Sequence, residues 1–242
     1  MRDFDIFKRQ IDIVPVQDLQ KKKFTLIGLG SLGSFTATIL AHMGAEKMEL
    51  FDDDLLEEHN LPVQFMHKHF LGQPKVEALK AQLGSWYGIT TVNTHAKKFA
   101  SGDKVSRIVI SGVDSLEARR NIWEGIVHNP GVDWYIDTRA GGLVNSIFTL
   151  DPNDQSTVDE YEETIKPDDD ILPLPCTQRM STFIASQTGS MVANIVVKLL
   201  REEHVPFKLV YDAENFHIGR TELKHYRKPE QQTFVFDRGA HA

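Results

Sequence analysis

The chain has 242 residues, of which 41% are hydrophobic and 25% charged, and its formal net charge is -7 at pH 7. This length allows one α/β domain with a buried core, whereas the acidic balance argues against duplex nucleic acid and anionic membranes as partners. No apolar run approaches a membrane span, the charged N-terminus is unlike a secretory signal, and one cysteine permits no internal disulfide, so we expect a cytoplasmic protein.

Strands and helices are expected to alternate along the first 150 residues. Short apolar runs predict buried strands, and apolar residues at helical spacing predict the helices between them. The expected order is strand 24–27, helix 34–43, strand 48–51, helix 76–83, strand 107–111, helix 116–127 and strand 134–137. Such alternation predicts an α/β fold with a doubly wound, mostly parallel Rossmann-like sheet.

The pattern changes after Leu150. Residues 151–180 are rich in Asp, Glu and Pro, and we expect a long crossover loop there, either functional or a disordered surface insertion. An apolar stripe over 191–200 then predicts a helix that packs in the core or in a dimer contact. Closing strands are expected at 208–211 and 222–226, followed by a loosely held tail over 228–242. All of this fits a single domain, 1–242.

A glycine-rich loop follows the first expected strand. Gly28, Gly30 and Gly33 fit the pattern G-x-G-x-x-G between a strand and a helix, which lets the backbone approach a phosphate at the helix N-terminus. Asp52 to Asp54 end the next strand, about 20 residues further on, where an acidic residue commonly binds ribose hydroxyls. These features predict a nucleotide site but do not separate NAD from ATP.

Two further charged residues stand at element boundaries. Lys75 starts the helix after Gly72-Gln-Pro and can either hold a polyphosphate or be an ordinary solvated lysine. Asp114 follows the third strand, where a carboxylate can hold Mg²⁺ or cap the next helix. Each residue alone leaves both interpretations open.

Taken in order, these motifs resemble the ThiF/MoeB/HesA family, bacterial relatives of the ubiquitin-activating enzymes. The resemblance extends from about residue 7 to residue 227. It rests on six segments: Lys8–Gln10, Leu26–Ser34, Asp52–Asp54 with Asn60, Leu61 and Gln64, Gly72–Glu77, Val113–Arg119, and Val210–Ala213.

The resemblance implies a function and a role for each residue. The implied reaction is ATP-dependent adenylation of the C-terminal carboxylate of a small ubiquitin-like or sulfur-carrier protein by a homodimer. Gly28, Gly30, Ser31 and Gly33 would line the nucleotide, and Asp52 and Asp54 would lie on its ribose side. Its phosphates would be contacted by Asn60, Gln64 and Lys75, and by Arg9 from the other subunit. Asp114 would hold Mg²⁺.

The chain departs from the family pattern in three respects. Val63 stands where the family has a phosphate-facing arginine, and we consider Arg139 as its substitute. The zinc-binding Cys-x-x-Cys pairs of many relatives are absent, and Ser115 replaces a frequent asparagine. Because of these differences, the first alternative is that the chain is a non-catalytic scaffold subunit of such an enzyme. An NAD-dependent oxidoreductase is the second, although it leaves Lys75 and Asp114 unexplained.

The single cysteine, Cys176, follows the expected crossover loop in Pro175-Cys-Thr177. This segment resembles the Cys-Thr of ubiquitin-activating enzymes, whose cysteine accepts the carrier as a thioester, and a thiolate is a capable nucleophile toward an acyl adenylate. A free cysteine packed as a small hydrophobic residue is an equally common arrangement. The sequence therefore leaves both roles open.

Overall fold

The computed structural model describes residues 4–89, 91–166 and 180–222. Its strands are β1 Lys23–Ile27, β2 Lys47–Phe51, β3 Val92–His95, β4 Ile108–Ser111, β5 Trp134–Gly141, β6 Val144–Leu150, β7 Lys208–Asp212 and β8 His217–Thr221. Its α-helices are α1 Val16–Lys21, α2 Ser31–Met43, α3 Lys75–Tyr87, α4 Leu116–Ile126, α5 Gln155–Glu163 and α6 Thr182–Leu200. Short 3-10 helices occupy Phe4–Phe7, Glu58–Asn60 and Lys68–Phe70.

All eight strands form one sheet in the order β3-β2-β1-β4-β5-β6-β7-β8. The strands from β3 to β5 pair in parallel, and β6, β7 and β8 add an antiparallel edge. The doubly wound α/β architecture expected from the sequence is thereby confirmed. Helices leave β1 and β4 toward opposite faces, so a ligand crevice is expected where the carboxyl ends of these two strands meet.

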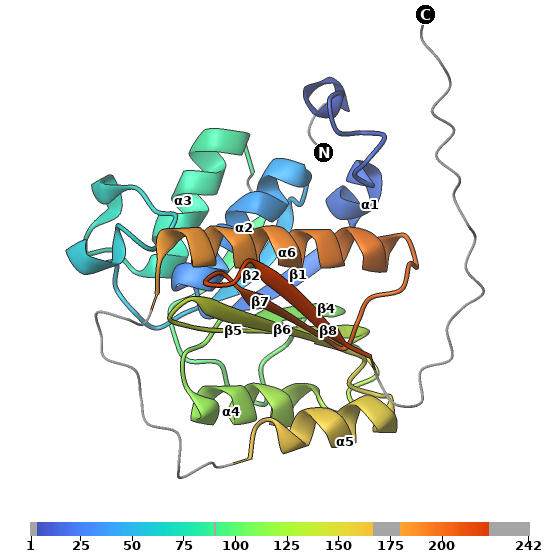
Figure 1. Cartoon of the computed structure of the whole chain (residues 1–242). Helices are drawn as coiled ribbons and strands as arrows, with labels where there is room; N and C mark the ends of the chain where they lie inside the picture. Colours follow the sequence, from blue (N-terminus) through green and yellow to red (C-terminus); the bar gives the residue numbers. More distant parts are fainter. Residues whose placement is uncertain (1–3, 90, 167–179, 223–242) are drawn as a thin grey trace, which may run out of the picture.

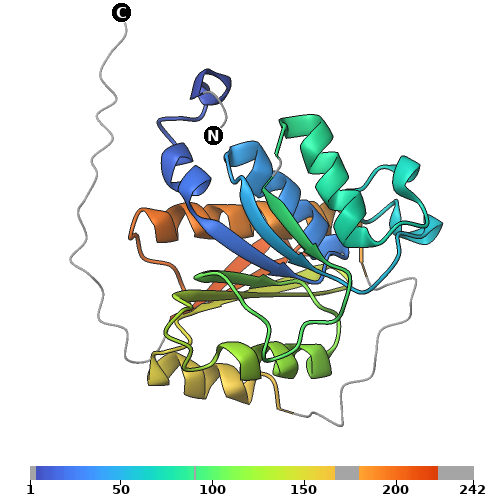
Figure 2. The same ribbon diagram turned by 180° about the vertical axis from the view of Figure 1, so that it is seen from behind.

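Helices cover both faces of the sheet (Figures 1 and 2). Helices α1, α2, α3 and α6 lie on one face, and α4 and α5 lie on the other, beneath β4, β5 and β6. The first face is sealed by a large apolar cluster that includes Leu26, Leu40 and Val196. The second is sealed by a smaller cluster that includes Trp123 and Tyr161. Burying both faces explains why the central strands are continuous apolar runs.

Helix α6 crosses α2 at close range. A Cβ on Gly189 would lie 3.0 Å from the amide nitrogen of Thr36 and 3.1 Å from the carbonyl carbon of Phe35. Glycine therefore lets the two backbones approach. Because α2 begins at the glycine loop, this contact helps to fix the direction in which the loop points.

The crossover after β6 is partly helical, which corrects the expectation of a continuous loop. Helix α5 is capped by Asp154, whose side chain accepts a hydrogen bond from the Ser156 N–H, and it buries Val158 and Tyr161 one turn apart. Its acidic composition conceals that apolar face, since only one side of the helix meets the core. Residues 167–179 of the crossover lie outside the described residues.

Other boundaries also differ from expectation. The closing strand after β7 is β8, earlier than the predicted 222–226, and the predicted tail over 228–242 lies outside the described residues. Strands β3 and β6 were not expected. Helix α6 is long and apolar enough to cross a membrane by length and composition, contrary to the expectation that no apolar run approaches such a span. Half of the apolar stretch of α6 is buried inside the protein, however, and core helices of this kind have the same length and composition.

The α2–α6 crossing generates a stability prediction. Gly189→Val should lower the free energy of unfolding by about 1–3 kcal/mol, because the new side chain meets the α2 backbone. Ser190→Ala, on the exposed side of the same helix, should change it by less than about 0.5 kcal/mol. Urea denaturation monitored by circular dichroism measures both values, and equal stabilities for the two variants would contradict the close crossing.

Candidate active site

The glycine loop connects β1 to α2. Gly28 adopts a positive φ of 83°, and a Cβ on it would lie 2.9 Å from Val113 Cγ1. A Cβ on Gly33 would lie 1.9 Å from the Gly28 carbonyl oxygen, so the turn can close only with glycine there. Gly30 caps α2 without a side chain, and the space beside it is open. The first N–H groups of α2, starting at Ser31, are therefore available to an anion.

Asp52, at the end of β2, holds this loop in place. Its Oδ2 accepts a hydrogen bond of 2.6 Å from the Leu29 N–H, and its Oδ1 accepts one of 2.9 Å from the Asp54 N–H. Burial raises the pKa of Asp52, while Lys75 and the two N–H groups act in the opposite direction. Both oxygens thus bind the backbone, which makes Asp52 a residue that shapes the loop.

Lys75 and Asp54 form an ion pair at the start of α3. Lys75 Nζ lies 2.6 Å from Asp54 Oδ2, and the Lys75 N–H donates to the Asp54 carbonyl oxygen at 2.9 Å. The lysine side chain is only 6% exposed, whereas that of Asp54 is 63% exposed. The possibility of a solvated lysine is therefore wrong. A buried ammonium with one exposed partner is positioned to bind a further anion.

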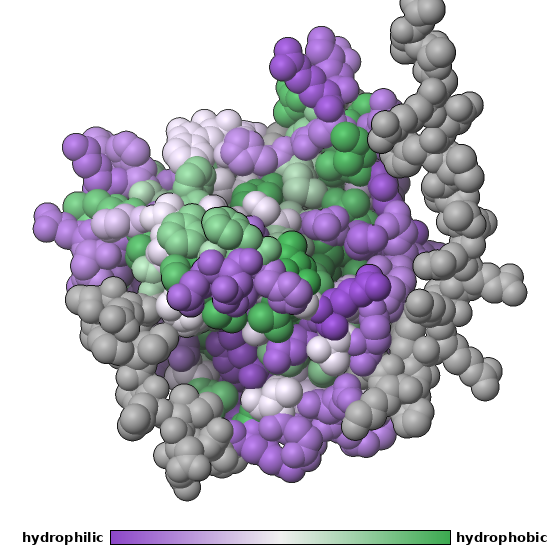
Figure 3. All heavy atoms as spheres, viewed as in Figure 1, coloured by the Kyte–Doolittle hydropathy of each residue, from purple (hydrophilic) through white to green (hydrophobic). Residues whose placement is uncertain are grey.

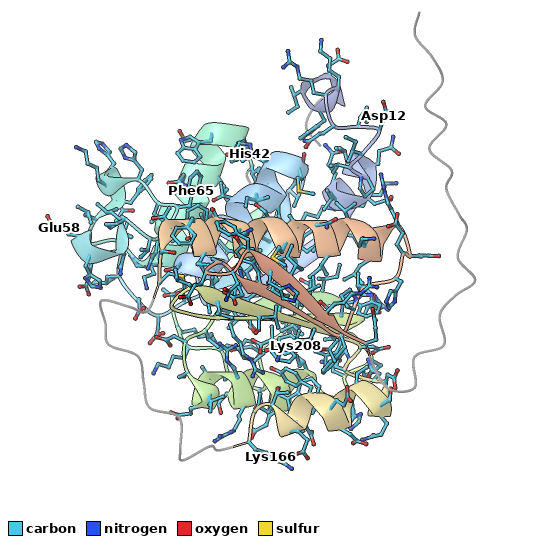
Figure 4. The ribbon with its side chains drawn as sticks, viewed as in Figure 1. Asp12, His42, Glu58, Phe65, Lys166 and Lys208 are labelled. Atoms are coloured by element: carbon cyan, nitrogen blue, oxygen red, sulfur yellow. The ribbon has the colours of Figure 1, made fainter. Side chains whose placement is uncertain are left out.

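The segment between β2 and α3 returns to α2. Ser34 accepts a hydrogen bond of 3.0 Å from the Phe65 N–H, and the Phe35 and Phe65 rings lie 5.0 Å apart. Figure 4 shows Phe65 close to α6 and Glu58 at the outer end of the segment. This fold-back brings Gln64 to the start of α2, where its buried Oε1 has no hydrogen-bond partner among the described residues.

Asn60 and Val63 lie on the same segment but in different local surroundings. The Asn60 side chain accepts the Glu57 N–H in a capping box. Val63 is half-buried beside Pro62, whose carbonyl oxygen accepts a hydrogen bond from Thr182 at the start of α6. At the position of the family arginine, this chain therefore has an uncharged turn that is hydrogen-bonded to the start of α6.

Asp114 lies beyond β4, on a loop that packs against the glycine loop through Val113 and Gly28. The helix cap is provided by Ser115, whose side chain accepts the Ala118 N–H, so the capping alternative for Asp114 is wrong. The Asp114 carboxylate is exposed and makes no hydrogen bond or ion pair in the described part of the chain. It is therefore free to bind a ligand.

A network of buried charged residues supports the loop that carries Asp114. The Asp137 carboxylate is fully buried and accepts hydrogen bonds from Arg119, Arg139, Ser111 and Tyr161. Arg119 also donates to the Val113 carbonyl oxygen. Buried carboxylates require such compensation. The network thus connects the middle of the sheet to the residue that precedes Asp114.

Arg139 belongs to this network and does not replace the missing arginine. Its Nε donates to Asp137 at 2.7 Å, and its two terminal nitrogens donate to the carbonyl and hydroxyl oxygens of Thr164, both at 2.9 Å. The guanidinium also lies 4.3 Å from the Phe148 ring centre. Burial is the largest single influence on the pKa of Arg139 and lowers it, but the Asp137 charge, the neighbouring Tyr161 and the hydrogen bonds to both together raise this pKa above its usual value. The idea that Arg139 contacts phosphates is therefore wrong.

The predicted nucleotide residues converge at one edge of the sheet. A continuous series of contacts runs from Lys75 through Asp54 and Asp52 to the glycine loop, and from Gly28 to the loop of Asp114. Open space at Gly30, free N–H groups at the start of α2 and a buried lysine are what a bound triphosphate requires. ATP thus fits the residues that are present.

Two predicted residues stand apart from this convergence. Arg9 is exposed on the N-terminal segment and forms no ion pair within the described residues. Cys176 lies outside the described residues. Metal ligation has a second candidate in Asp52, Asp53 and Asp54, whose oxygens lie within 4.8 Å of one another. Two of these carboxylates already bind the backbone and Lys75, so Asp114 fits Mg²⁺ better.

A parallel α/β sheet with a glycine loop, an acidic strand end and a buried lysine at its carboxyl edge defines a nucleotide-binding protein. The sequence profile described as the ThiF family matches residues 7–233. The chain therefore belongs to the ThiF family.

Curated relatives agree with this assignment. The chain is 28% identical over 225 residues to ubiquitin-like modifier-activating enzyme 5 of Bombyx mori, covering 81% of this chain and 56% of the relative. The Rattus norvegicus enzyme of that name is 27% identical over 236 residues, with 85% and 57% covered. The chain thus spans little more than half the length of these relatives.

Solved structures support the fold. The structure of PaaA superimposes with a TM-score of 0.70 at 18% identity and covers 91% of this chain and 73% of its own. The structure of E. coli MccB with ATP gives a TM-score of 0.66 at 18% identity, with 90% and 68% covered. At such identities the likeness concerns the fold alone.

The role of Arg139 can be tested by a charge-conserving change. Arg139→Lys should lower the free energy of unfolding by about 1–3 kcal/mol, because a lysine cannot bind Asp137 and Thr164 together. ATP affinity, measured by calorimetry, should stay within about twofold of the wild type. The control Arg107→Lys alters an exposed ion pair with Asp133 and should leave the free energy of unfolding nearly unchanged. A stable Arg139→Lys variant that loses ATP affinity would contradict the structural role.

Proposed function

We propose that the chain uses ATP to adenylate the C-terminal carboxylate of a small ubiquitin-like or sulfur-carrier protein. The observation that carries this proposal is the buried Lys75 ammonium, held by the exposed Asp54 beside the open N-terminus of α2. A dinucleotide-binding loop needs an acidic residue for the ribose but no buried lysine next to it. This arrangement favours a triphosphate over NAD.

The proposed reaction needs positioning and charge neutralisation more than a strong base. A carboxylate oxygen of the carrier attacks the α-phosphorus of ATP, a new P–O bond forms, and the bond to the β-phosphate oxygen breaks to release pyrophosphate. Lys75 and the N–H groups of α2 neutralise charge on the phosphates. Mg²⁺ bound by Asp114 would stabilise negative charge on the same oxygens, and Asp54 would bind the ribose once Lys75 turns to the phosphates.

An exposed apolar patch supports a protein as the acceptor. The patch consists of Leu143, Val144, Phe216 and Ile218. Phe216 is 84% exposed and Ile218 is 60% exposed. The patch surrounds the β5–β6 turn and the β7–β8 hairpin, where the Ala213 N–H donates to the Leu143 carbonyl oxygen. Because β5 runs parallel to β4, this turn lies at the same edge as the glycine loop. Hydrophobic side chains gather over α6 and beside the hairpin in Figure 3.

Patches of this kind usually mark protein contacts. The relatives named as activating enzymes of a ubiquitin-like modifier, and the solved complex of MccB with MccA, are consistent with a macromolecular acceptor. Val63 is the observation that favours a scaffold subunit instead, because it removes a phosphate-facing charge. Catalysis by the isolated chain distinguishes the two functions.

Carrier-dependent exchange of ATP with labelled pyrophosphate tests the proposed function. Lys75→Ala and Asp114→Ala should each reduce exchange by about 100-fold or more, because each removes a charge at the phosphates. Lys68→Ala changes an exposed lysine on the neighbouring segment and should leave exchange intact. Wild-type exchange in both site variants would show that the site is misassigned, and no exchange by the wild type with any carrier ending in Gly-Gly would favour the scaffold.

We also propose a homodimer in which Arg9 completes the partner's phosphate site. The exposed Arg9, together with the exposed Ile6 and Ile13 on the same segment, supports a contact with a second copy. An inactive Arg9→Ala variant mixed with Lys75→Ala should recover up to about a quarter of wild-type exchange, since half of the dimers are hybrids with one intact site. A fully active monomer in analytical ultracentrifugation would rule this out.

Cys176 is proposed to accept the carrier after adenylation. Cys176→Ala should retain pyrophosphate exchange and lose any carrier adduct that thiols cleave, because the thiol acts only in the second step. Non-reducing gel electrophoresis with and without added thiol detects such an adduct. If the wild type adenylates a carrier but never forms it, Cys176 has no covalent role.

A further inference from the structure

A cavity of about 360 Å³ lies at the opposite edge of the sheet from the glycine loop. It is enclosed by the start of β5 at Trp134, the end of β6 at Thr149, the end of α6 at Leu199 and the following loop at Phe207. Because β5 begins here and ends beside the nucleotide site, the two places are a strand length apart. The volume falls within the range of small-molecule sites.

The rim of this cavity is acidic. Five carboxylates contribute to its lining: Asp151, Asp154, Glu202, Glu203 and Glu222. Glu203 pairs with Lys198 and Arg201, and Glu222 pairs with His204 and lies 3.8 Å from Arg220.

The other three carboxylates lack a cationic partner in the described part of the chain. Asp151 and Asp154 use one oxygen each for the backbone N–H groups of Asn153 and Ser156. The α6 helix ends at this rim, and the C-terminal end of a helix carries partial negative charge. The cavity therefore offers a negative potential to whatever enters it.

A second, independent feature points to a ligand. Thr149 lines the cavity and is only 4% exposed, and its buried Oγ1 has no hydrogen-bond partner among the described residues. A buried hydroxyl without a partner costs free energy unless something occupies the space beside it. The half-buried Trp134 adds an aromatic surface, which attracts cations to its face.

From these features we propose that the cavity binds a small organic cation with alkylammonium groups, such as a short diamine. The carboxylates would hold the charged ends, Trp134 and Leu199 would contact the aliphatic part, and Thr149 Oγ1 would accept a hydrogen bond from an ammonium group. This site involves neither ATP nor a carrier and goes beyond the proposed function.

Calorimetric titration of the full-length chain with 1,4-diaminobutane tests the proposal. The diamine should bind with a Kd on the order of 0.1–1 mM, and more weakly at high salt. The neutral analogue 1,4-butanediol should not bind. N-acetyl-lysine methylamide, which presents the ammonium of a protein side chain, should bind more weakly than the diamine.

Three variants locate the binding site. Asp151→Asn with Asp154→Asn keeps an acceptor oxygen for both backbone N–H groups but removes two charges, and should weaken diamine binding by about tenfold or more. Thr149→Val should weaken binding by about fivefold without lowering the unfolding free energy. Asp103→Asn is the matched control, because Asp103 also accepts a backbone N–H, from Ala100, but lies outside the cavity lining.

Several results would overturn the proposal. Absence of binding at about 10 mM diamine excludes a cation site of useful affinity. Equal binding of diamine and diol excludes charge recognition, and tighter binding of the lysine mimic assigns the cavity to a protein side chain. Wild-type affinity in the Asp151 and Asp154 double variant, or in Thr149→Val, places the diamine elsewhere.

Discussion

The hydrogen bond between the half-buried Asp52 carboxylate and the Leu29 N–H fixes the position of the glycine loop, and the rest of the site is arranged around it. It holds the end of β1 against the end of β2, so α2 starts at one defined place with its N–H groups free. Asp52 also accepts a hydrogen bond from the N–H of Asp54, two residues further along the chain. Asp54 in turn forms the ion pair with Lys75 at the start of α3. One carboxylate thus determines how the glycine loop, Asp54 and Lys75 are placed relative to one another.

A second layer supports the other half of the site. Asp137 is buried with two arginines, and one of them, Arg119, reaches the backbone just before Asp114. The other, Arg139, connects Asp137 to Thr164 at the end of α5, within the crossover. Removing one member of such a network leaves a buried charge without compensation. The loop of Asp114 and the end of α5 therefore depend on the same buried carboxylate.

Sequence patterns predicted those parts of the fold in which local signals and packing agree. The strands buried on both faces are apolar runs that end in glycine or aspartate, and the glycine loop is defined by spacing alone. Strand β3 was missed because only Val92 is buried in it, and α5 because its acidic residues hide one apolar face. The burial of Lys75 and the structural role of Arg139 could not be inferred from the sequence, since both depend on contacts between distant segments.

We propose that ATP binds where the glycine loop, Asp54, Lys75 and the loop of Asp114 meet. Amide chemical shifts of isotope-labelled protein, titrated with a non-hydrolysable ATP analogue and Mg²⁺, locate the nucleotide most directly. If ATP binds there, the largest chemical-shift changes should fall on residues 28–33, 52–54 and 112–114, and NAD should produce much smaller changes. Shifts centred on Trp134 and Thr149, or equal responses to NAD, would contradict it.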